Sequence, residues 1–332
     1  MEILHIHIYS VVLSQIIRLA RKLKTIELSI ESLLDLFTTD NVSNRVRNEF
    51  NAQGKILYRN LSQEEETNLI LEIQAKILDP SAPRAGTSFK NNWESNWKSN
   101  LLDFQEQKNK SSLIPKFISE NQVARFKGKF VMPLTSNFEM QIVKILRVYL
   151  FEKYFSEINE LHEFGAGTGF NLVHFGEIFR EKKLYGYDWS ESAVDLINRV
   201  ADQNSLMLKA ELFDMFNPNY EVKIPENSGL LTVGAMEQLG TNWKPFLDFM
   251  LAKDFNIYIN IETIYEKTNQ GDTEFARISR QYIERRNWLR GYFDELRKLE
   301  LDGLVEILDQ KVVVGSKFHD SWSFTVWRLA NV

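Results

Sequence analysis

The part of this chain that most constrains its fold is a turn with glycine at alternate positions, Gly165, Gly167 and Gly169. An acidic residue, Glu163, stands two positions before the first glycine at the end of an apolar run, and the residues after the turn predict a helix. Because glycine lacks a Cβ and tolerates positive φ, such a turn lets the backbone approach a bound nucleoside closely. The turn therefore narrows the function to enzymes or sensors that hold a nucleoside-bearing cofactor.

Short apolar runs alternate with helix-length connections from residue 136 onward. The runs are residues 160–164, 184–188, 206–213, 230–233 and 257–261. This spacing predicts βαβ units, and so an α/β fold with a mostly parallel sheet and helices on both faces. Two further apolar runs, 305–314 and 321–329, lie a few residues apart with Gly315 between them. That spacing predicts an antiparallel C-terminal hairpin.

The N-terminal residues follow a different pattern, in which apolar side chains recur at helical spacing. Ser62 and Glu65 precede an apolar run in the arrangement of a capping box, which predicts that a helix begins there. Both observations predict that the first part of the chain is mostly helical.

The change of pattern predicts two regions. We expect a helical N-terminal region at 1–112, which acts as a lid, a docking surface or a packing element. Trp93 and Trp97 lie one helical turn apart within it and either pack in a core or close over a site. We expect a cofactor-binding domain at 113–332, with an insertion at about 263–300.

The composition excludes several classes of function. The chain has no cysteine, which excludes disulfides, thiolate catalysis and cysteine-ligated zinc. The histidines show no metal-ligand spacing, so no metal site is predicted, and a partly buried apolar segment explains His5 and His7 better. A net charge of -5 gives no reason to expect nucleic acid as a partner.

Residues 1–20 are rich in apolar side chains, interrupted by charged and histidine residues. They lack the basic start and the small-residue cleavage site of a secretory signal. No apolar run reaches the roughly 20 residues that a membrane-spanning helix needs. We therefore expect a cytoplasmic protein without integral membrane association.

Two common nucleotide-binding motifs do not fit the glycine turn. The dinucleotide fingerprint requires a glycine where this chain has Phe170, which disfavours a nicotinamide oxidoreductase. A phosphate-binding P-loop requires Gly-Lys-Ser/Thr, which is absent. The turn has no basic residue to offset phosphate charge, and Glu163 would oppose a pyrophosphate. An acid before the glycines suits a cationic ligand better.

Residues 163–169 resemble the first motif of the class I S-adenosylmethionine-dependent methyltransferases, E/D-x-G-x-G-x-G. Asp188, which ends the second predicted strand, matches the acid that binds both ribose hydroxyls in this family. Asp214 resembles the acid after strand three that contacts the adenine amino group. The resemblance covers about 138–329. It implies a seven-stranded Rossmann-like sheet of order 3-2-1-4-5-7-6, with strand seven antiparallel.

The resemblance also implies S-adenosyl-L-methionine as the cofactor and the residues that bind it. They lie at the ends of the first four strands of the implied sheet: Glu163, Phe164, Gly165, Ala166, Gly167, Gly169, Asp188, Trp189, Asp214, Met215 and Gly234. The methyl group is then expected to point toward the loop after strand four.

Three titratable side chains are candidates for catalysis at that edge of the sheet. Glu237 follows strand four, Glu262 ends strand five, and His319 lies in the hairpin turn. Each could orient or deprotonate a methyl acceptor. Glu237 is equally explained as an acid that stabilises a helix start, and His319 as a surface turn residue.

Substrate-binding candidates lie on the helical stripe of the insertion, at Tyr282, Arg285 and Arg286. An arginine on an apolar face either extends its charge to solvent or meets an anion. The D/N-P-P-Y/F motif of the family's amino-methylating branch is absent after strand four, which disfavours methylation of base amines or glutamine amides.

Our first hypothesis is therefore a class I methyltransferase that acts on O or N of a small or medium-sized acceptor, with an anionic or sugar-linked acceptor as one option. One alternative is a protein or peptide methyltransferase that docks its substrate on the N-terminal helices. The other is a non-catalytic cofactor-binding subunit. The sequence sets neither the acceptor atom nor the oligomeric state.

Overall fold

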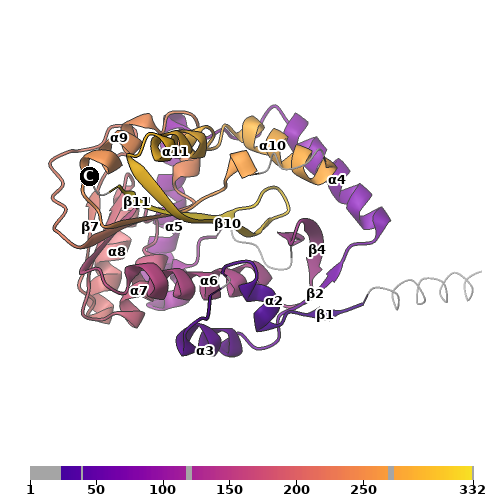
Figure 1. Ribbon diagram of the computed structural model, residues 1–332, viewed down its shortest axis with the longest axis horizontal. Coiled ribbons are helices and arrows are strands. Elements are labelled where there is room, and N and C mark those ends of the chain that lie inside the picture. The colour runs from indigo at the N-terminus through magenta and orange to yellow at the C-terminus, as the bar shows by residue number, and fades with distance from the viewer. Residues whose placement is uncertain (1–23, 39, 117–121, 268–272, 331–332) are drawn as a thin grey trace, which may run out of the picture.

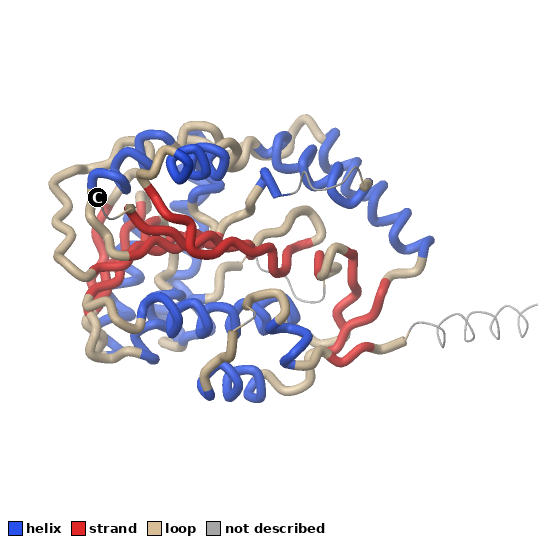
Figure 2. Tube along the Cα trace, viewed as in Figure 1, coloured by secondary structure: helices blue, strands red, loops and turns tan. Residues whose placement is uncertain are grey.

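The computed structural model describes residues 24–38, 40–116, 122–267 and 273–330. Within them, eleven strands form one mixed sheet (Figure 2) in the order β1-β2-β4-β3-β10-β11-β9-β8-β5-β6-β7. The strands are β1 (Ile26–Glu27), β2 (Leu57–Asn60), β3 (Ala124–Phe126), β4 (Lys129–Pro133), β5 (Glu160–Phe164), β6 (Lys183–Asp188), β7 (Leu208–Leu212), β8 (Ser228–Val233), β9 (Ile257–Ile261), β10 (Val305–Ser316) and β11 (Trp322–Leu329).

The predicted seven-stranded sheet is therefore wrong in its extent and in its complete order. The four strands β1 to β4 lie beyond β10 and lengthen the sheet. The other seven strands, numbered from β5 as the first, follow one another in the order 3-2-1-4-5-7-6. The prediction missed the added strands because they are two to five residues long and have no clear alternation.

The centre of the sheet is parallel, as the spacing of the apolar runs predicts. β5 pairs in parallel with β6 and β8, β6 with β7, and β8 with β9. Every residue of β5 and β9 is buried, which is typical of parallel strands covered on both faces. β11 is antiparallel to both β9 and β10, so the predicted C-terminal hairpin is confirmed.

Helices cover both faces of the sheet (Figure 1). Helices α2, α3, α6, α7 and α8 share one apolar core with the sheet, and α9 and α11 share a second core on the other face. The helices are α2 (Ile30–Leu34), α3 (Asn44–Ala52), α4 (Gln63–Leu78), α5 (Lys90–Gln107), α6 (Phe138–Phe155), α7 (Phe170–Ile178), α8 (Glu191–Asn204), α9 (Lys244–Ala252), α10 (Glu274–Arg286) and α11 (Tyr292–Leu301), with short 3-10 turns η1 (Thr87–Phe89), η2 (Lys110–Leu113), η3 (Met236–Leu239) and η4 (Tyr265–Lys267).

The N-terminal region is less purely helical than expected. Its strand β2 pairs with β1 and with β4, so this region joins the same sheet as the rest of the chain. The capping box that starts α4 is confirmed, because Ser62 Oγ accepts from Glu65 N and Glu65 Oε2 accepts from Ser62 N, at 3.2 and 2.8 Å. The region boundary at 112 stays a prediction. The interpretation of residues 1–20, with His5 and His7, falls outside the described residues.

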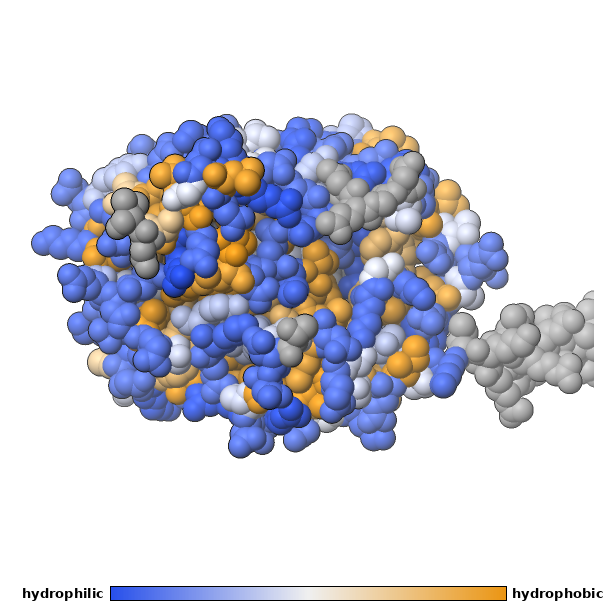
Figure 3. Space-filling view, in the orientation of Figure 1, coloured by the Kyte–Doolittle hydropathy of each residue, from blue (hydrophilic) through white to orange (hydrophobic). Residues whose placement is uncertain are grey.

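The face of the molecule in Figure 3 is mainly hydrophilic, with hydrophobic residues visible where it is hollowed between the upper and lower helices. In the part of the chain that the structure describes, no helix combines the length and the apolar character that crossing a bilayer requires.

Candidate active site

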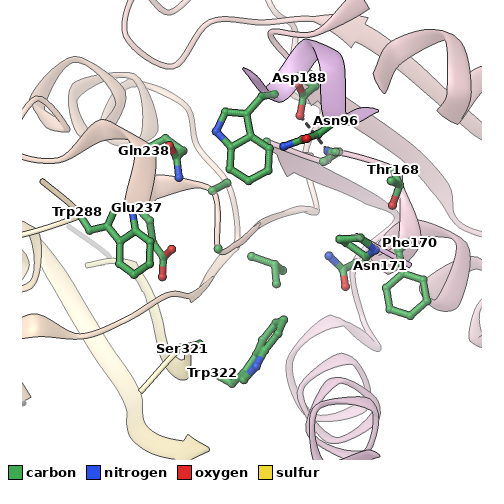
Figure 4. Close-up of a pocket in the computed structure, with 18 of the residues that line it drawn as sticks. Asn96, Thr168, Phe170, Asn171, Asp188, Glu237, Gln238, Trp288, Ser321 and Trp322 are labelled. Atoms are coloured by element: carbon green, nitrogen blue, oxygen red, sulfur yellow. Dashed lines mark hydrogen bonds between the residues drawn. The ribbon is translucent and has the colours of Figure 1, made fainter. Parts of the chain in front are cut away.

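A cavity of about 510 Å³ lies at the carboxyl ends of the parallel strands. Its wall includes the glycine turn after β5, the end of β6 and the loop after β8, together with side chains from α5, α6, α10 and the β10–β11 turn. Figure 4 shows Asp188 and Asn96 on one side of this space and Glu237, Gln238 and Trp288 on another, with the Glu237 carboxylate pointing inward. Ligands of open α/β sheets bind at this edge.

The glycine turn joins β5 to α7, as the sequence predicts. Gly165, Gly167 and Gly169 have φ values of 73°, 55° and 74°, in the left-handed region that glycine adopts most readily. The N–H groups of Gly165 and Ala166 donate to Tyr187 O at the end of β6, at 2.7 and 3.0 Å. The turn is therefore held against the neighbouring strand while part of its backbone lines the cavity.

Gly165 is required by close packing as well as by its φ. A Cβ placed on Gly165 would overlap the Cβ of Ala235 in the loop after β8. We expect Gly165→Ala to lower the free energy of unfolding by about 3 kcal/mol, of which roughly 1 kcal/mol comes from left-handed strain and the rest from overpacking. Chemical denaturation of the purified variant measures this loss.

Gly303→Ala is the matched control for that substitution. Gly303 has the same φ of 73°, and a Cβ there would meet no atom within 4 Å. It should lose only about 1 kcal/mol, through strain alone. Equal losses for the two variants would show that the contact between the two loops does not matter.

Asp188 ends β6 and lines the cavity. Its Oδ2 accepts from Gly167 N at 2.9 Å and its Oδ1 accepts from Ser190 N at 3.0 Å. Each carboxylate oxygen has two lone pairs, so the group can still accept two ligand hydroxyls. Burial raises the pKa of Asp188 to about 6. The side chain is thus oriented by the backbone and available to a diol.

An aromatic pair lies beside Asp188. The rings of Trp189 and Phe216 are nearly parallel, with centroids 5.8 Å apart and an interplanar angle of 19°. Both residues line the cavity together with Met215. Asp214 does not line it, because its Oδ1 accepts from Phe216 N at 2.9 Å and shapes the loop. These apolar faces offer a surface to a planar base.

A buried polar chain lies on the other side of the glycine turn. Arg147 Nη1 donates to Asn171 Oδ1 at 2.6 Å, and Asn171 Nδ2 donates to Glu163 Oε1 at 2.7 Å. Arg147 and Asn171 line the cavity, whereas Glu163 is fully buried behind them. Burial raises the pKa of Glu163 to about 8. Within the described residues, Arg147 Nε is buried and has no hydrogen-bond partner, so one donor of the guanidinium is left unsatisfied.

Helix α5 closes the cavity over the glycine turn. A Cβ on Gly167 would lie 2.9 Å from Trp97 Cζ2, so the indole rests on the turn. Thr168 Oγ1 donates to Leu113 O at 2.6 Å, just after this helix. Glu94 accepts from Ser190 Oγ at 2.6 Å, at the start of α8. The tryptophan residues of α5 therefore contribute both packing and cover, the two roles that the sequence left open.

Glu237, Thr263 and His319 form a hydrogen-bonded chain at the opposite end of the cavity. Thr263 Oγ1 lies 2.8 Å from Glu237 Oε1 and 2.9 Å from His319 Nδ1. All three side chains are buried, and Glu237 and His319 line the cavity. The chain links the loop after β8, the end of β9 and the β10–β11 turn.

Burial acts in opposite directions on the two titratable members of this chain. It raises the pKa of Glu237 to about 7. Burial, together with the charges of Arg125 and Arg286, lowers the pKa of His319 to about 3. The imidazole of His319 is therefore neutral near pH 7, while Glu237 changes charge there.

Glu262 and Arg285 do not reach the cavity, contrary to their predicted roles. Glu262 Oε1 accepts from Ala235 N and Met236 N at 3.1 and 3.2 Å, which orients the loop that carries Glu237. Arg285 Nη2 donates to Asp79 O at 2.5 Å. Each of these two side chains forms hydrogen bonds with backbone groups, and the spacing of residues in the sequence does not predict these bonds.

Tyr282 and Arg286 line the cavity as predicted. Arg286 Nε donates to Pro83 O at 2.6 Å and its Nη1 donates to Tyr282 Oη at 2.9 Å. Two carboxyl groups, Glu139 and Glu237, line the same cavity. Because Arg286 already has two partners and acids lie nearby, the arrangement gives little support to an anionic acceptor.

The predicted cofactor residues divide into two groups. Those that line the cavity are Gly165, Ala166, Gly167, Asp188, Trp189, Met215 and Gly234, and those that do not are Glu163, Phe164, Gly169 and Asp214. Phe164 belongs to the apolar core, where its ring stacks on Tyr187 with centroids 4.6 Å apart. Gly169 instead makes room for Ile197 of α8.

The sequence analysis missed several residues of the cavity wall. They are Asn96, Arg147, Asn171, Gln238, Trp288 and Trp322, and Thr263 lies directly behind the wall. Arg147 left one usable signal, because it interrupts the apolar pattern of a buried helix. Thr263 left none, since a threonine after a strand is common.

Comparisons with known proteins find similar structures but no similar sequence family. No protein-family model matches the sequence, and no curated protein matches it. An S-adenosylmethionine-dependent methyltransferase structure from Aquifex aeolicus is 18% identical, covering 55% of this chain and 87% of its own, with a TM-score of 0.38. An O-methyltransferase family protein from Burkholderia thailandensis is 8% identical, covering 58% and 60%, with a TM-score of 0.42. A geranyl diphosphate C-methyltransferase from Streptomyces coelicolor A3(2) is 10% identical, covering 60% and 86%, with a TM-score of 0.41.

TM-scores of about 0.4 are too low to assign a fold. The strand arrangement of this chain shows its fold directly. The parallel strands β5 to β9, the antiparallel β11 beside β9 and the glycine turn after β5 all have the arrangement that the sequence motifs implied. The chain has a Rossmann-like fold in which β11 is antiparallel to its neighbours. The fold alone leaves activity and acceptor open, because one fold supports many functions.

Proposed function

We propose that this protein is an S-adenosylmethionine-dependent methyltransferase that acts on a small molecule. The observation that supports it most is that a single cavity is lined both by residues that suit a nucleoside and by residues that can accept a proton. The first end has the glycine turn and Asp188, and the second has Glu237 and His319. A sensor would need the first end only.

The residues around the glycine turn fit the cofactor. Asp188 would accept the two ribose hydroxyls, a charge-assisted arrangement, while Trp189 and Phe216 would contact the adenine. Arg147 and Asn171, which both line the cavity, would hold the carboxylate of the amino-acid end. When bound, the cofactor supplies a methyl carbon activated by a positively charged sulfur.

Enclosure of the cavity favours a small acceptor over a protein or peptide. Helix α5 covers the glycine turn, and Ala85 in the loop before it donates to Arg286 O at 2.8 Å. These contacts place α5 over the glycine turn and join the loop before α5 to the end of α10, which restricts access for a bulky substrate. Holding the acceptor in line with the methyl group then supplies much of the rate.

Formation of S-adenosylhomocysteine tests the proposal. The purified chain is incubated with S-adenosylmethionine and a panel of small alcohols, sugars, phenols and amines, with peptides as a separate group. We expect turnover with members of the small-molecule panel. Turnover with peptides alone would support the docking alternative, and cofactor binding without any turnover would support a non-catalytic subunit.

A further inference from the structure

The hydrogen-bonded chain of Glu237, Thr263 and His319 contains one hydroxyl proton, that of Thr263. This proton can be donated to only one of the two neighbouring side chains. When Glu237 is ionised, its Oε1 can only accept, so Thr263 must donate its proton to that oxygen, 2.8 Å away. Thr263 Oγ1 then has only lone pairs to offer His319 Nδ1, 2.9 Å away. His319 must therefore carry its proton on Nδ1, and its Nε2 keeps a lone pair.

The surroundings hold the imidazole in one orientation. Its ring lies parallel to Tyr282, with an interplanar angle of 8° and centroids 6.2 Å apart, and edge-on to Trp288 at 4.5 Å. No hydrogen bond within the described residues occupies Nε2, whereas Nδ1 is bonded to Thr263. Because His319 lines the cavity, the free nitrogen is available to a ligand there.

The turn that carries His319 is itself anchored. Arg125 on β3 is buried, and its Nε donates to Asp320 Oδ1 at 3.2 Å while its Nη2 donates to Phe275 O of α10 at 2.9 Å. The charged and titratable groups facing His319 are therefore Arg125 and Asp320, Arg286 and Tyr282 from α10, and Glu237 after β8. Among them only Glu237 is coupled to the ring through a hydrogen bond, by way of Thr263.

We propose that Thr263 couples Glu237 to His319 as a unit that accepts the proton of a hydroxyl, so that the methyl acceptor atom is an oxygen. This inference rests on the proposed function. His319 is the catalytic residue in it, because it lines the cavity and would contact the acceptor through Nε2, while its Nδ1 is bonded to Thr263. Thr263 is a positioning residue, since it acts through His319.

The transfer balances without any further reactant. The acceptor oxygen forms the new bond to the methyl carbon as its proton passes to His319 Nε2. The bond from that carbon to sulfur breaks, and its electron pair stays on sulfur. The imidazolium that results donates from Nδ1 to Thr263, which donates to the Glu237 carboxylate. The negative charge of this carboxylate, 4.0 Å from Nδ1, then offsets part of the effect of burial and of Arg125 and Arg286, which otherwise hold the pKa of His319 at about 3.

A base of this kind is needed for an alcohol or a phenol and not for an amine. An unprotonated amine attacks with its free lone pair and can lose its proton afterwards. A hydroxyl keeps a tightly held proton until attack, so that a positioned base accelerates its reaction, typically by 10²- to 10⁴-fold.

Two substitutions of Thr263 test the proposal. Thr263→Val keeps the shape and removes the hydroxyl, and Thr263→Ser restores it. With the hydroxyl acceptor that turns over fastest, we expect the valine variant to lower kcat roughly 10- to 100-fold with an unchanged KM for that acceptor. The serine variant should recover most of this loss. Thr325→Val, at another buried threonine whose Oγ1 accepts from Gln310, controls for the loss of a buried hydroxyl.

A second readout does not depend on turnover. Nitrogen-15 NMR of labelled histidine, with His319 assigned from a His319→Asn variant, reports which ring nitrogen carries the proton. We expect the Nδ1–H tautomer in the wild type and in Thr263→Ser, and a mixture or the Nε2–H tautomer in Thr263→Val. A wild-type Nε2–H tautomer, or a valine variant with wild-type kcat, would overturn the proposal. Failure of the proposed function looks different, because then either S-adenosylhomocysteine does not bind or it binds and no acceptor of any class is methylated.

Discussion

Replacing Asp188 with alanine is expected to weaken binding of S-adenosylhomocysteine by about 100-fold or more. The carboxylate is oriented by Gly167 N and Ser190 N at 2.9 and 3.0 Å and would accept both ribose hydroxyls. Hydrogen bonds to a charged group contribute about 1.5 kcal/mol or more each, and about 3 kcal/mol corresponds to roughly a 100-fold change in Kd. Isothermal titration calorimetry measures the two affinities directly.

Asp195→Ala provides the control for the Asp188 experiment. Asp195 is also an acid near the start of α8, but it is half exposed and forms an ion pair with Arg199 of the same helix. Its removal changes the net charge equally and should leave the affinity within a factor of two or so, because exposed pairs contribute little. If Asp188→Ala folds and binds as tightly as this control, Asp188 does not contact the ribose.

The second large effect is expected in the pH dependence of methyl transfer. Burial raises the pKa of Glu237 to about 7, so the carboxylate is protonated below that pH and ionised above it. Only the ionised form has no proton to donate, so that it must accept the Thr263 hydroxyl, and only this form carries the negative charge that stabilises a positive His319. At saturating cofactor, kcat/KM for the acceptor should therefore rise about tenfold per pH unit up to about 7 and level off above it, since this parameter reports groups of the form that binds the acceptor.

Glu237→Gln should abolish the rise in kcat/KM between acidic pH and pH 7, here called the acid limb. It should also lower the plateau value of kcat/KM by about 100-fold. Glu139→Gln is the matched variant, because Glu139 also lines the cavity but accepts from Trp322 Nε1 and not from Thr263. The Glu139→Gln variant should keep the acid limb of kcat/KM that ends near pH 7, even if its plateau value changes. A limb that survives in Glu237→Gln would show that another group controls the profile.

Local features of the site could be predicted from the sequence, because short stretches determine them. The glycine turn needs positive φ at three positions, and only glycine adopts that readily. Asp188 could be placed at a strand end because its apolar run is clear. The hairpin followed from two strand-length runs separated by a short turn.

The rest of the site depends on contacts between residues that are distant in sequence. Trp97 rests on Gly167, and no local pattern in either segment reveals the other. Glu237 and Glu262 both follow parallel strands, yet backbone N–H groups turn Glu262 inward and leave Glu237 in the cavity wall. Arg285 and Arg286 are adjacent, and successive helical residues differ by about 100° in direction, so only one of them lines the cavity.

The added strands could not be foreseen for a similar reason. β2 has four residues and β3 has three, too few for a periodic pattern to emerge. β3 becomes a strand because it pairs with β10, almost two hundred residues later. That pairing places Arg125 beside the turn that carries His319, so the extension of the sheet supports the site.

The central claim is that the cavity binds S-adenosylmethionine and its product. Calorimetric titration of the purified full chain with S-adenosylhomocysteine, and separately with NAD, tests it most directly. We predict saturable binding of S-adenosylhomocysteine with a micromolar Kd and no measurable heat with NAD. Binding of NAD in the absence of S-adenosylhomocysteine binding would contradict the account.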